Sequence, residues 1–167
     1  VVTIGSIHGG VRSNIIREQV EMLGTIRALS DADEKLLIDR IKQIATKTAE
    51  AAGATAVVEI PWSVRYPVTY NHVALTEQML PSLQRTAGVQ NVLLKPATTG
   101  AEDFSFFQEK VPGLYVILGG MPKGLDPKKA HSHHTPDFMI DEISFTLGVQ
   151  TLTNLTLDYM AARAGKK

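Results

Sequence analysis

The 167-residue sequence contains no cysteine, which excludes disulfide bonds, thiolate zinc fingers and a cysteine nucleophile. It also has no net charge, because 17 Lys and Arg balance 17 Asp and Glu, and this argues against a generally basic nucleic-acid-binding protein. No apolar run reaches the roughly 18 residues that a membrane span requires. The first residues carry no basic region of the kind that begins a signal peptide. We therefore expect neither a nucleic-acid nor a membrane partner.

The composition that is present is that of an ordinary globular protein, with 44% hydrophobic and 20% charged residues. Such a composition excludes intrinsic disorder, which needs low hydrophobicity and high net charge. The length allows one domain of usual size or two small ones, and it is sufficient to bury a core. Because the chain opens directly on an apolar strand pattern, VVTIGSI, we interpret it as part of a longer polypeptide.

The first part of the chain has the pattern of a small α+β unit. We predict strands over residues 1–7, 19–29 and 55–64, with a helix between the second and the third. Ser30 is a typical N-cap for this helix, and Gly53 is a typical residue at its C-terminal end. Residues 65–71 include a proline and several polar side chains, and we interpret them as a linker.

The second part alternates between helical and short apolar patterns. We predict helices over residues 72–86, 102–111 and 141–162, and short strands over residues 92–94 and 114–118. Pro81 should kink the first of these helices or end it early. The continuous apolar run at residues 114–118 is typical of a buried strand. The predicted fold class is α/β: an α+β segment with an antiparallel sheet and a helix, followed by an α/β segment with parallel character.

Three histidines, His131, His133 and His134, lie in the polar segment AHSHHTPDF, which follows the apolar run at residues 114–118. Loops that follow strands of α/β sheets are common places for functional sites, and neutral imidazole is a common zinc ligand. The same histidines could form a solvated surface cluster. The spacing alone leaves both interpretations open.

Other candidate residues lie near predicted strand ends. His8 precedes two glycines that permit a tight turn, where an imidazole could donate a hydrogen bond to an oxyanion or serve only as a turn residue. Arg27 could bind a carboxylate or remain a solvated charge, and Asn14 lies between the two predicted strands. Residues 98–104, TTGAEDF, place a glycine turn before a helix, where an anion could bind or the two acids could complement the helix dipole.

Five motifs, taken in order, resemble one family: VVTIGSIHGGVRSNII, GTIR, YPVTYNH, TTGAEDFSFF and HHTPDFMIDE. The chain is similar to the C-terminal part of the dinuclear-metal amidohydrolases, which include hippurate hydrolase, N-acyl-amino-acid amidohydrolases and indole-acetyl-amino-acid hydrolases. These enzymes are relatives of the aminoacylase and carboxypeptidase group of zinc peptidases. The resemblance covers essentially the whole chain. It implies that residues 1–68 form part of a lid and dimerisation domain and that residues 69–167 form the C-terminal segment of a catalytic domain.

The resemblance also implies roles for individual residues. His134 matches the C-terminal metal-ligand histidine of the family. His8 matches the lid histidine that reaches an active site, typically across the dimer, and polarises the scissile carbonyl. Asn14 and Arg27 match lid positions that grip the substrate, and Gly100 matches a loop near the substrate carboxylate.

The activity implied by the resemblance is hydrolysis of the amide bond of N-acyl amino acids or small peptides by a cytoplasmic homodimer. Two divalent metal ions, zinc or manganese, would activate a water molecule while a glutamate acts as general base. A catalytic metal site takes about three protein ligands. The family's other ligands precede the segment present here, so we expect the chain alone to be inactive. Two alternatives are a non-catalytic dimerisation module and a carboxylate-binding protein that uses Arg27 and residues 98–100.

Overall fold

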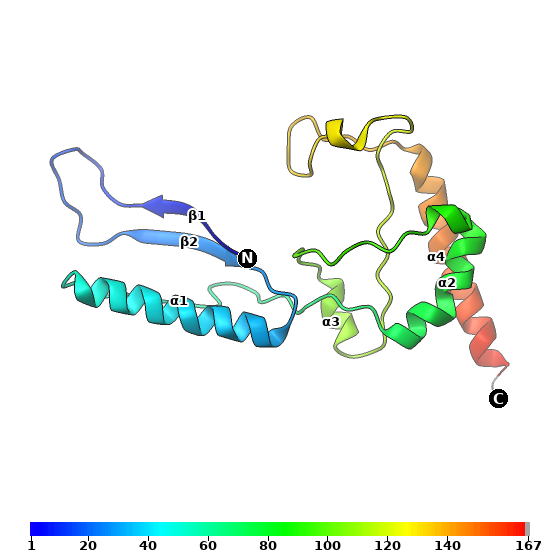
Figure 1. Ribbon diagram of the computed structural model, residues 1–167, viewed down its shortest axis with the longest axis horizontal. Coiled ribbons are helices and arrows are strands. Elements are labelled where there is room, and N and C mark those ends of the chain that lie inside the picture. The colour runs from blue at the N-terminus through cyan, green and yellow to red at the C-terminus, as the bar shows by residue number, and fades with distance from the viewer. Residues whose placement is uncertain (166–167) are drawn as a thin grey trace. The chain divides into compact units, whose positions relative to one another are not determined.

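The computed structural model describes residues 1–165 and divides them into two compact units (Figure 1). The first unit comprises Val1–Thr69 and Pro96–Val111, and the second comprises Tyr70–Lys95 and the residues from Pro112 onward. Residues 166 and 167 of the predicted 69–167 segment lie outside the described part of the chain.

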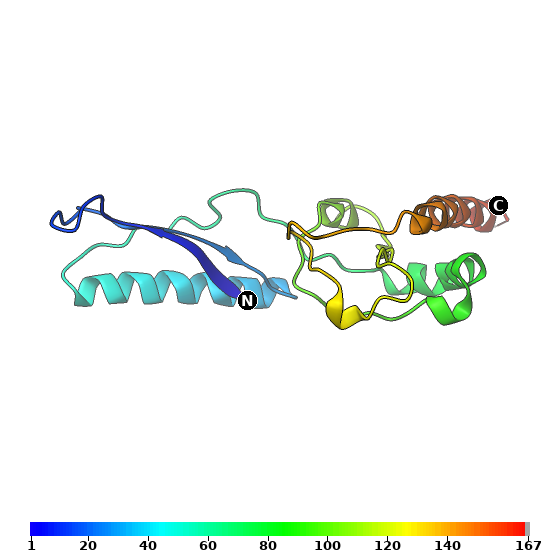
Figure 2. The same cartoon turned by 90° about the horizontal axis from the view of Figure 1, so that it is seen from above.

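The first unit contains an antiparallel hairpin of β1 (Val2–His8) and β2 (Glu21–Ile26). Its register runs from Val2 opposite Ile26 to His8 opposite Glu21, with an irregularity between Ile4 and Ser6. Both strands were expected from the apolar pattern, and both are confirmed. In the two views, helix α1 (Asp31–Ala51) runs alongside this hairpin (Figures 1 and 2).

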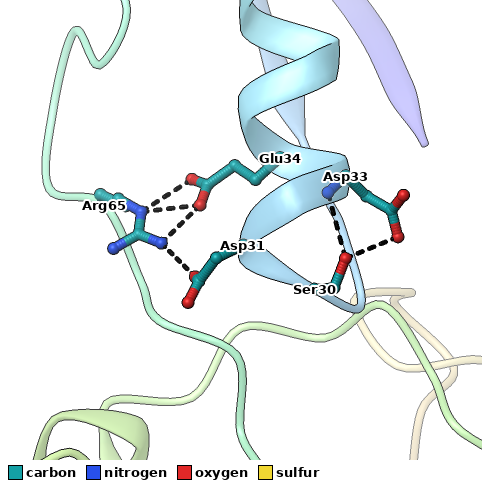
Figure 3. A network of polar contacts seen from close by, with 5 residues as sticks. All are labelled: Ser30, Asp31, Asp33, Glu34 and Arg65. Carbon is teal, nitrogen blue, oxygen red and sulfur yellow. Dashed lines mark hydrogen bonds and ion pairs between the residues drawn. The ribbon is translucent and has the colours of Figure 1, made fainter.

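Helix α1 begins where its capping residue predicts. The Ser30 side chain accepts a hydrogen bond from the backbone N–H of Asp33 at 3.0 Å, which satisfies one of the free donors of the first turn (Figure 3). Three acidic side chains, Asp31, Asp33 and Glu34, lie in this turn, next to the positive end of the helix dipole. Local sequence signals therefore determine this element.

The segment that follows α1 is not the strand expected over residues 55–64. It has no strand partner within the described residues, and an arginine attaches it to α1 instead. Nε of Arg65 donates to both carboxylate oxygens of Glu34 at 2.9 and 2.7 Å, and Nη2 donates to Asp31 at 2.5 Å (Figure 3). The hydrogen bonds to Glu34 raise the pKa of the guanidinium, so Arg65 stays charged. The ion pairs of Arg65 thus attach this segment to α1, in place of the backbone hydrogen bonds of the expected strand.

Replacing Arg65 with alanine should release this segment from α1. Because the Arg65 side chain is 41% exposed, the loss of stability should be at most about 1 kcal/mol, yet amide exchange over residues 55–65 should become faster. Hydrogen–deuterium exchange measures this directly. Lys35→Ala, which removes an exposed ion pair with Asp39 on the same helix, is the matched control. Equal exchange in the two variants would contradict the attachment.

The short helix α3 (Phe104–Gln108) completes the first unit and is shorter than the predicted helix over residues 102–111. Ser105 is fully buried, and its hydroxyl donates to the carbonyl of Glu102 at 2.6 Å. The ring of Phe106 packs against Tyr66 with centroids 5.7 Å apart. The ring contact joins α3 to the linker region of its own unit, and the Ser105 hydrogen bond is local to the start of the helix.

The second unit is built on two helices, α2 (Val73–Ala87) and α4 (Ile143–Ala164), which lie side by side (Figures 1 and 2). The apolar side chains of Met79 and Leu83 on α2 are buried. Two short 3₁₀ turns, η1 (Val89–Asn91) and η2 (Pro127–Lys129), also belong to this unit.

Polar contacts join the same two helices. Arg85 forms an ion pair with Asp158, and the side chain of Asn154 donates to Thr86 at 2.9 Å. Helix α2 continues for six residues beyond Pro81, to Ala87, so of the two outcomes expected at this proline, a kink or an early end, the early end does not occur. Packing against α4 compensates for the one backbone hydrogen bond that proline cannot donate.

The strands predicted at residues 92–94 and 114–118 do not form, and the described residues contain no parallel sheet. A strand needs a second strand to which its backbone can hydrogen-bond. Residues around 114–118 instead form hydrogen bonds with the two residues that precede α2. Asn71 bonds both backbone groups of Tyr115, donating to its carbonyl at 2.8 Å and accepting from its N–H at 2.7 Å. The N–H of His72 donates to the carbonyl of Gly113 at 3.0 Å. The expected burial is also wrong, since Ile117 is 62% exposed.

The expected α/β class, with its antiparallel sheet and helices, is nevertheless confirmed. Helix α4 carries no buried residue, and much of its apolar surface is open. Its large exposed apolar side chains are Ile143, Phe145, Val149, Leu152, Leu157 and Met160. Among residues 1–165, no helix combines the length and the apolar character that crossing a membrane requires.

Candidate active-site residues

His8 is the last residue of β1, and its side chain is exposed at the end of the hairpin. Gly10, two residues later, has φ +103°, a conformation that favours glycine. At Gly9 a Cβ atom would lie 2.7 Å from the Val20 side chain, so the two ends of the connecting loop approach closely. A pocket of about 150 Å³ lies at this end of the hairpin. It is lined by His8, Gly9, Gly10, Arg17, Gln19 and Glu21.

Arg27 lies at the opposite end of the same hairpin. Its N–H donates to the carbonyl of Val1 at 2.8 Å, and the N-terminal ammonium donates back to its carbonyl at 2.7 Å. The strand register therefore separates the backbones of Arg27 and His8 by about 20 Å, at about 3.3 Å per residue. Asn14 lies in the loop at the His8 end and is exposed. The hairpin places Asn14 with His8, and not with Arg27.

Gly100 lies in a segment without helix or strand that leads to α3. A Cβ atom at this position would meet only the Glu102 side chain, at 3.9 Å, so the backbone here does not require glycine. Asp103, which precedes α3, makes no side-chain capping bond, and α3 has only five residues. Such a short helix provides a weak dipole for an anion. The substrate-binding role of Gly100 stays a prediction.

His134 adopts a left-handed backbone conformation with φ 64°, the single non-glycine residue in this region among residues 1–165. Such a conformation is uncommon outside glycine and tends to occur where function requires it. The loop around it is held by internal contacts. The Thr135 hydroxyl donates to the carbonyl of Ser132 at 2.7 Å, and the N–H of Phe138 donates to the carbonyl of Thr135 at 3.1 Å. The imidazole of His134 is therefore exposed on an ordered turn.

The described residues supply a single candidate metal donor rather than a complete metal site. Within residues 1–165, no three His, Asp or Glu side chains come close enough together to hold an ion. The exposed imidazole of His134 fits as one ligand of a divalent cation, because neutral imidazole binds zinc and other transition metals. A catalytic ion needs further ligands, which this part of the chain does not provide.

Two residues that organise the structure escaped the sequence interpretation. Asn71 belongs to the motif YPVTYNH and Arg65 to the predicted linker, and neither residue carries a predicted role of its own. Both act over long sequence distances, since Asn71 bonds Tyr115 and Arg65 bonds Glu34. The only local signal at Asn71 is its position, since it is a polar residue directly before His72, the N-cap of α2. No local pattern identified Arg65.

Comparison with known proteins identifies the family of this chain. The sequence matches the profile of peptidase family M20/M25/M40 over residues 4–158. It is 33% identical over 150 residues to thermostable carboxypeptidase 2 of Saccharolobus solfataricus, covering 89% of this chain and 36% of that protein. It is 30% identical over 166 residues to the N-acetyldiaminopimelate deacetylase of Leuconostoc citreum, covering 99% of this chain and 41% of that protein.

A solved structure agrees with these matches. The Bacillus subtilis YXEP protein, described as a dinuclear metal binding peptidase from the M20 family, is similar with a TM-score of 0.69 and 26% identity. The similarity covers 93% of this chain and 40% of that one. The chain thus spans about two fifths of the length of the relatives it matches. The resemblance to dinuclear-metal amidohydrolases and peptidases is confirmed at this level: the chain belongs to peptidase family M20/M25/M40.

Proposed function

We propose that this chain forms part of a metal-dependent amidohydrolase that cleaves the amide bond of N-acyl amino acids, hippurate-like compounds included, or of small peptides. The names of its relatives, a carboxypeptidase and a deacetylase, support hydrolysis of an amide bond. The observation that carries the proposal is His134, an exposed imidazole held in a left-handed turn within the motif HTPDF.

In this proposal His134 is one ligand of a two-metal site that contains zinc or manganese. Such an ion, when bound, polarises the amide carbonyl and lowers the pKa of a water molecule. The remaining ligands and the general base would come from further polypeptide, because the described residues form no group of three donors. The exposed apolar side chains of α4 support this, since they offer a surface on which further polypeptide could pack.

We propose that residues 1–68 act as a lid through which two copies associate. Both outer edges of the two-stranded sheet are unpaired in the described residues, and a free edge can accept a strand from another copy. His8 would donate a hydrogen bond to the oxyanion, while Asn14 and Arg27 would bind the substrate. The separation of about 20 Å between His8 and Arg27 favours a dimer in which one hairpin serves two active sites.

Replacement of His134 by alanine tests the function. We expect the manganese-loaded assembled enzyme to release free amino acid from hippurate or N-acetyl amino acids, and His134→Ala to lower the rate at least about 100-fold. His131→Ala, which changes a neighbouring histidine, is the matched control and should retain the rate. If the metal-loaded enzyme hydrolyses none of these amides but light scattering shows a dimer, the chain is a non-catalytic dimerisation module.

A further inference from the structure

We propose that His133 is a positioning residue that, together with Phe138, clamps the turn that presents His134. The clamp is defined as the ring pair of His133 and Phe138. This inference rests on the proposed role of His134 as a metal ligand. Neither the motif HTPDF nor the family match assigns a role to the histidine that precedes it.

The two rings of the clamp are in direct contact. Their centroids lie 4.6 Å apart with an interplanar angle of 41°, within the range of favourable aromatic pairs. Residues 134–137 lie between them in sequence, so the ring contact closes the turn across its two ends. The ring of His133 also faces the edge of the His134 ring, with centroids 6.4 Å apart and an angle of 60°. His133 therefore takes part in both ring pairs, one with Phe138 and one with the proposed ligand His134.

The clamp addresses a specific requirement of this turn. A residue at φ 64° directs its side chain differently from one in an extended conformation, so the backbone at His134 decides where the imidazole points. The left-handed region is unfavourable for a residue with a Cβ atom unless neighbouring contacts hold it. The hydrogen bond from the Thr135 hydroxyl to the Ser132 carbonyl spans residues 133 and 134, and that from the Phe138 N–H to the Thr135 carbonyl spans residues 136 and 137. The ring contact of His133 and Phe138 spans the longer segment, because it joins the two ends of residues 133–138.

The first test measures the backbone of His134 without metal or substrate. A left-handed residue gives a strong nuclear Overhauser effect between its own amide and Hα protons, because positive φ brings them close. We expect this signal at His134 in the wild-type chain, its loss in His133→Ala, and its retention in His133→Phe, which keeps an aromatic ring without a nitrogen. His131→Ala is the control and should keep the signal.

The second test measures zinc affinity by calorimetry in the assembled enzyme. We expect His133→Ala to weaken zinc binding about tenfold, as removal of a group that orients a ligand does, and His133→Phe to restore it. Phe138→Leu, which keeps apolar bulk without a ring, should behave like His133→Ala and guards against a folding defect in the first variant.

The outcomes separate the two proposals. An unchanged signal at His134 in both His133→Ala and Phe138→Leu would overturn the clamp. Failure of His133→Phe to restore zinc binding would also overturn it, since His133 would then act through its nitrogens. Unchanged zinc affinity in His134→Ala would refute the proposed metal ligand, and the nuclear Overhauser effect would still report on the clamp.

Discussion

Replacing Asn71 with alanine is expected to lower the free energy of unfolding of the second unit by about 2 to 4 kcal/mol. The Asn71 side chain makes two hydrogen bonds to one residue, because its amide group pairs with both the carbonyl and the N–H of Tyr115. The contact is partly buried, so truncation leaves two backbone groups with poor access to water. Each such orphaned group adds to the loss of the bond itself. Urea denaturation followed by circular dichroism measures the change.

A matched asparagine tests whether this effect is specific. Asn91 also bonds a backbone carbonyl, that of Ala87 at 2.7 Å, but it does so at an exposed position. Asn91→Ala should therefore cost no more than about 1 kcal/mol. Asn71→Asp separates the two bonds, because a carboxylate still accepts from the Tyr115 N–H but cannot donate to its carbonyl. If Asn71→Ala and Asn91→Ala lower the free energy of unfolding equally, the two hydrogen bonds to Tyr115 contribute no more than an exposed hydrogen bond does.

The second large effect is expected at Gly24 in β2. A Cβ atom there would lie 2.5 Å from the carbonyl oxygen of Thr3 on the paired strand, and 3.0 Å from the Ile4 side chain. Backbone cannot yield as a flexible side chain does, so Gly24→Ala must separate the strands or shift their register. We expect a loss of about 3 kcal/mol or more, at the upper end of overpacking effects. Cross-strand nuclear Overhauser effects between Thr3 and Thr25 should weaken or disappear.

Gly5, on the other strand of the same hairpin, is the control for this prediction. A Cβ atom at Gly5 would meet only the carbonyl of Leu23, at 4.0 Å, which is an ordinary contact. Gly5→Ala should be neutral or stabilise the strand by about 0.5 kcal/mol. The hairpin register sets the positions of His8 and Arg27, so the proposed function implies that the Gly24 variant also reduces hydrolysis by the assembled protein. Similar stability of the two alanine variants would contradict the steric explanation.

The elements that could be predicted from sequence are those with local signals. Ser30 identifies the start of α1 because an N-cap acts within one helical turn, and the apolar pattern identifies both strands of the hairpin. The predicted strand at residues 114–118 fails for a different reason. Its apolar run is compatible with a buried strand, but a ladder requires a neighbour, and sequence pattern does not show whether one is present.

The same division applies to the candidate site. His134 could be named as a candidate metal ligand from its motif, since the order of several motifs is specific, and that role stays a prediction. Its positive φ could not be predicted, because that conformation depends on how the turn closes through Phe138 and Thr135. The attachment of Arg65 to Glu34 joins residues 31 positions apart. Such contacts follow from the tertiary arrangement, and a single sequence carries little record of them.

The open apolar surface of α4 has a consequence for the lifetime of this chain in a cell. Chaperones and proteases bind polypeptides that expose large apolar side chains, and α4 exposes Ile143, Val149 and Leu152. A copy whose α4 remains uncovered should therefore be degraded faster than one whose α4 is covered. The abundance of the chain would then follow the supply of whatever covers this helix, which couples its accumulation to assembly.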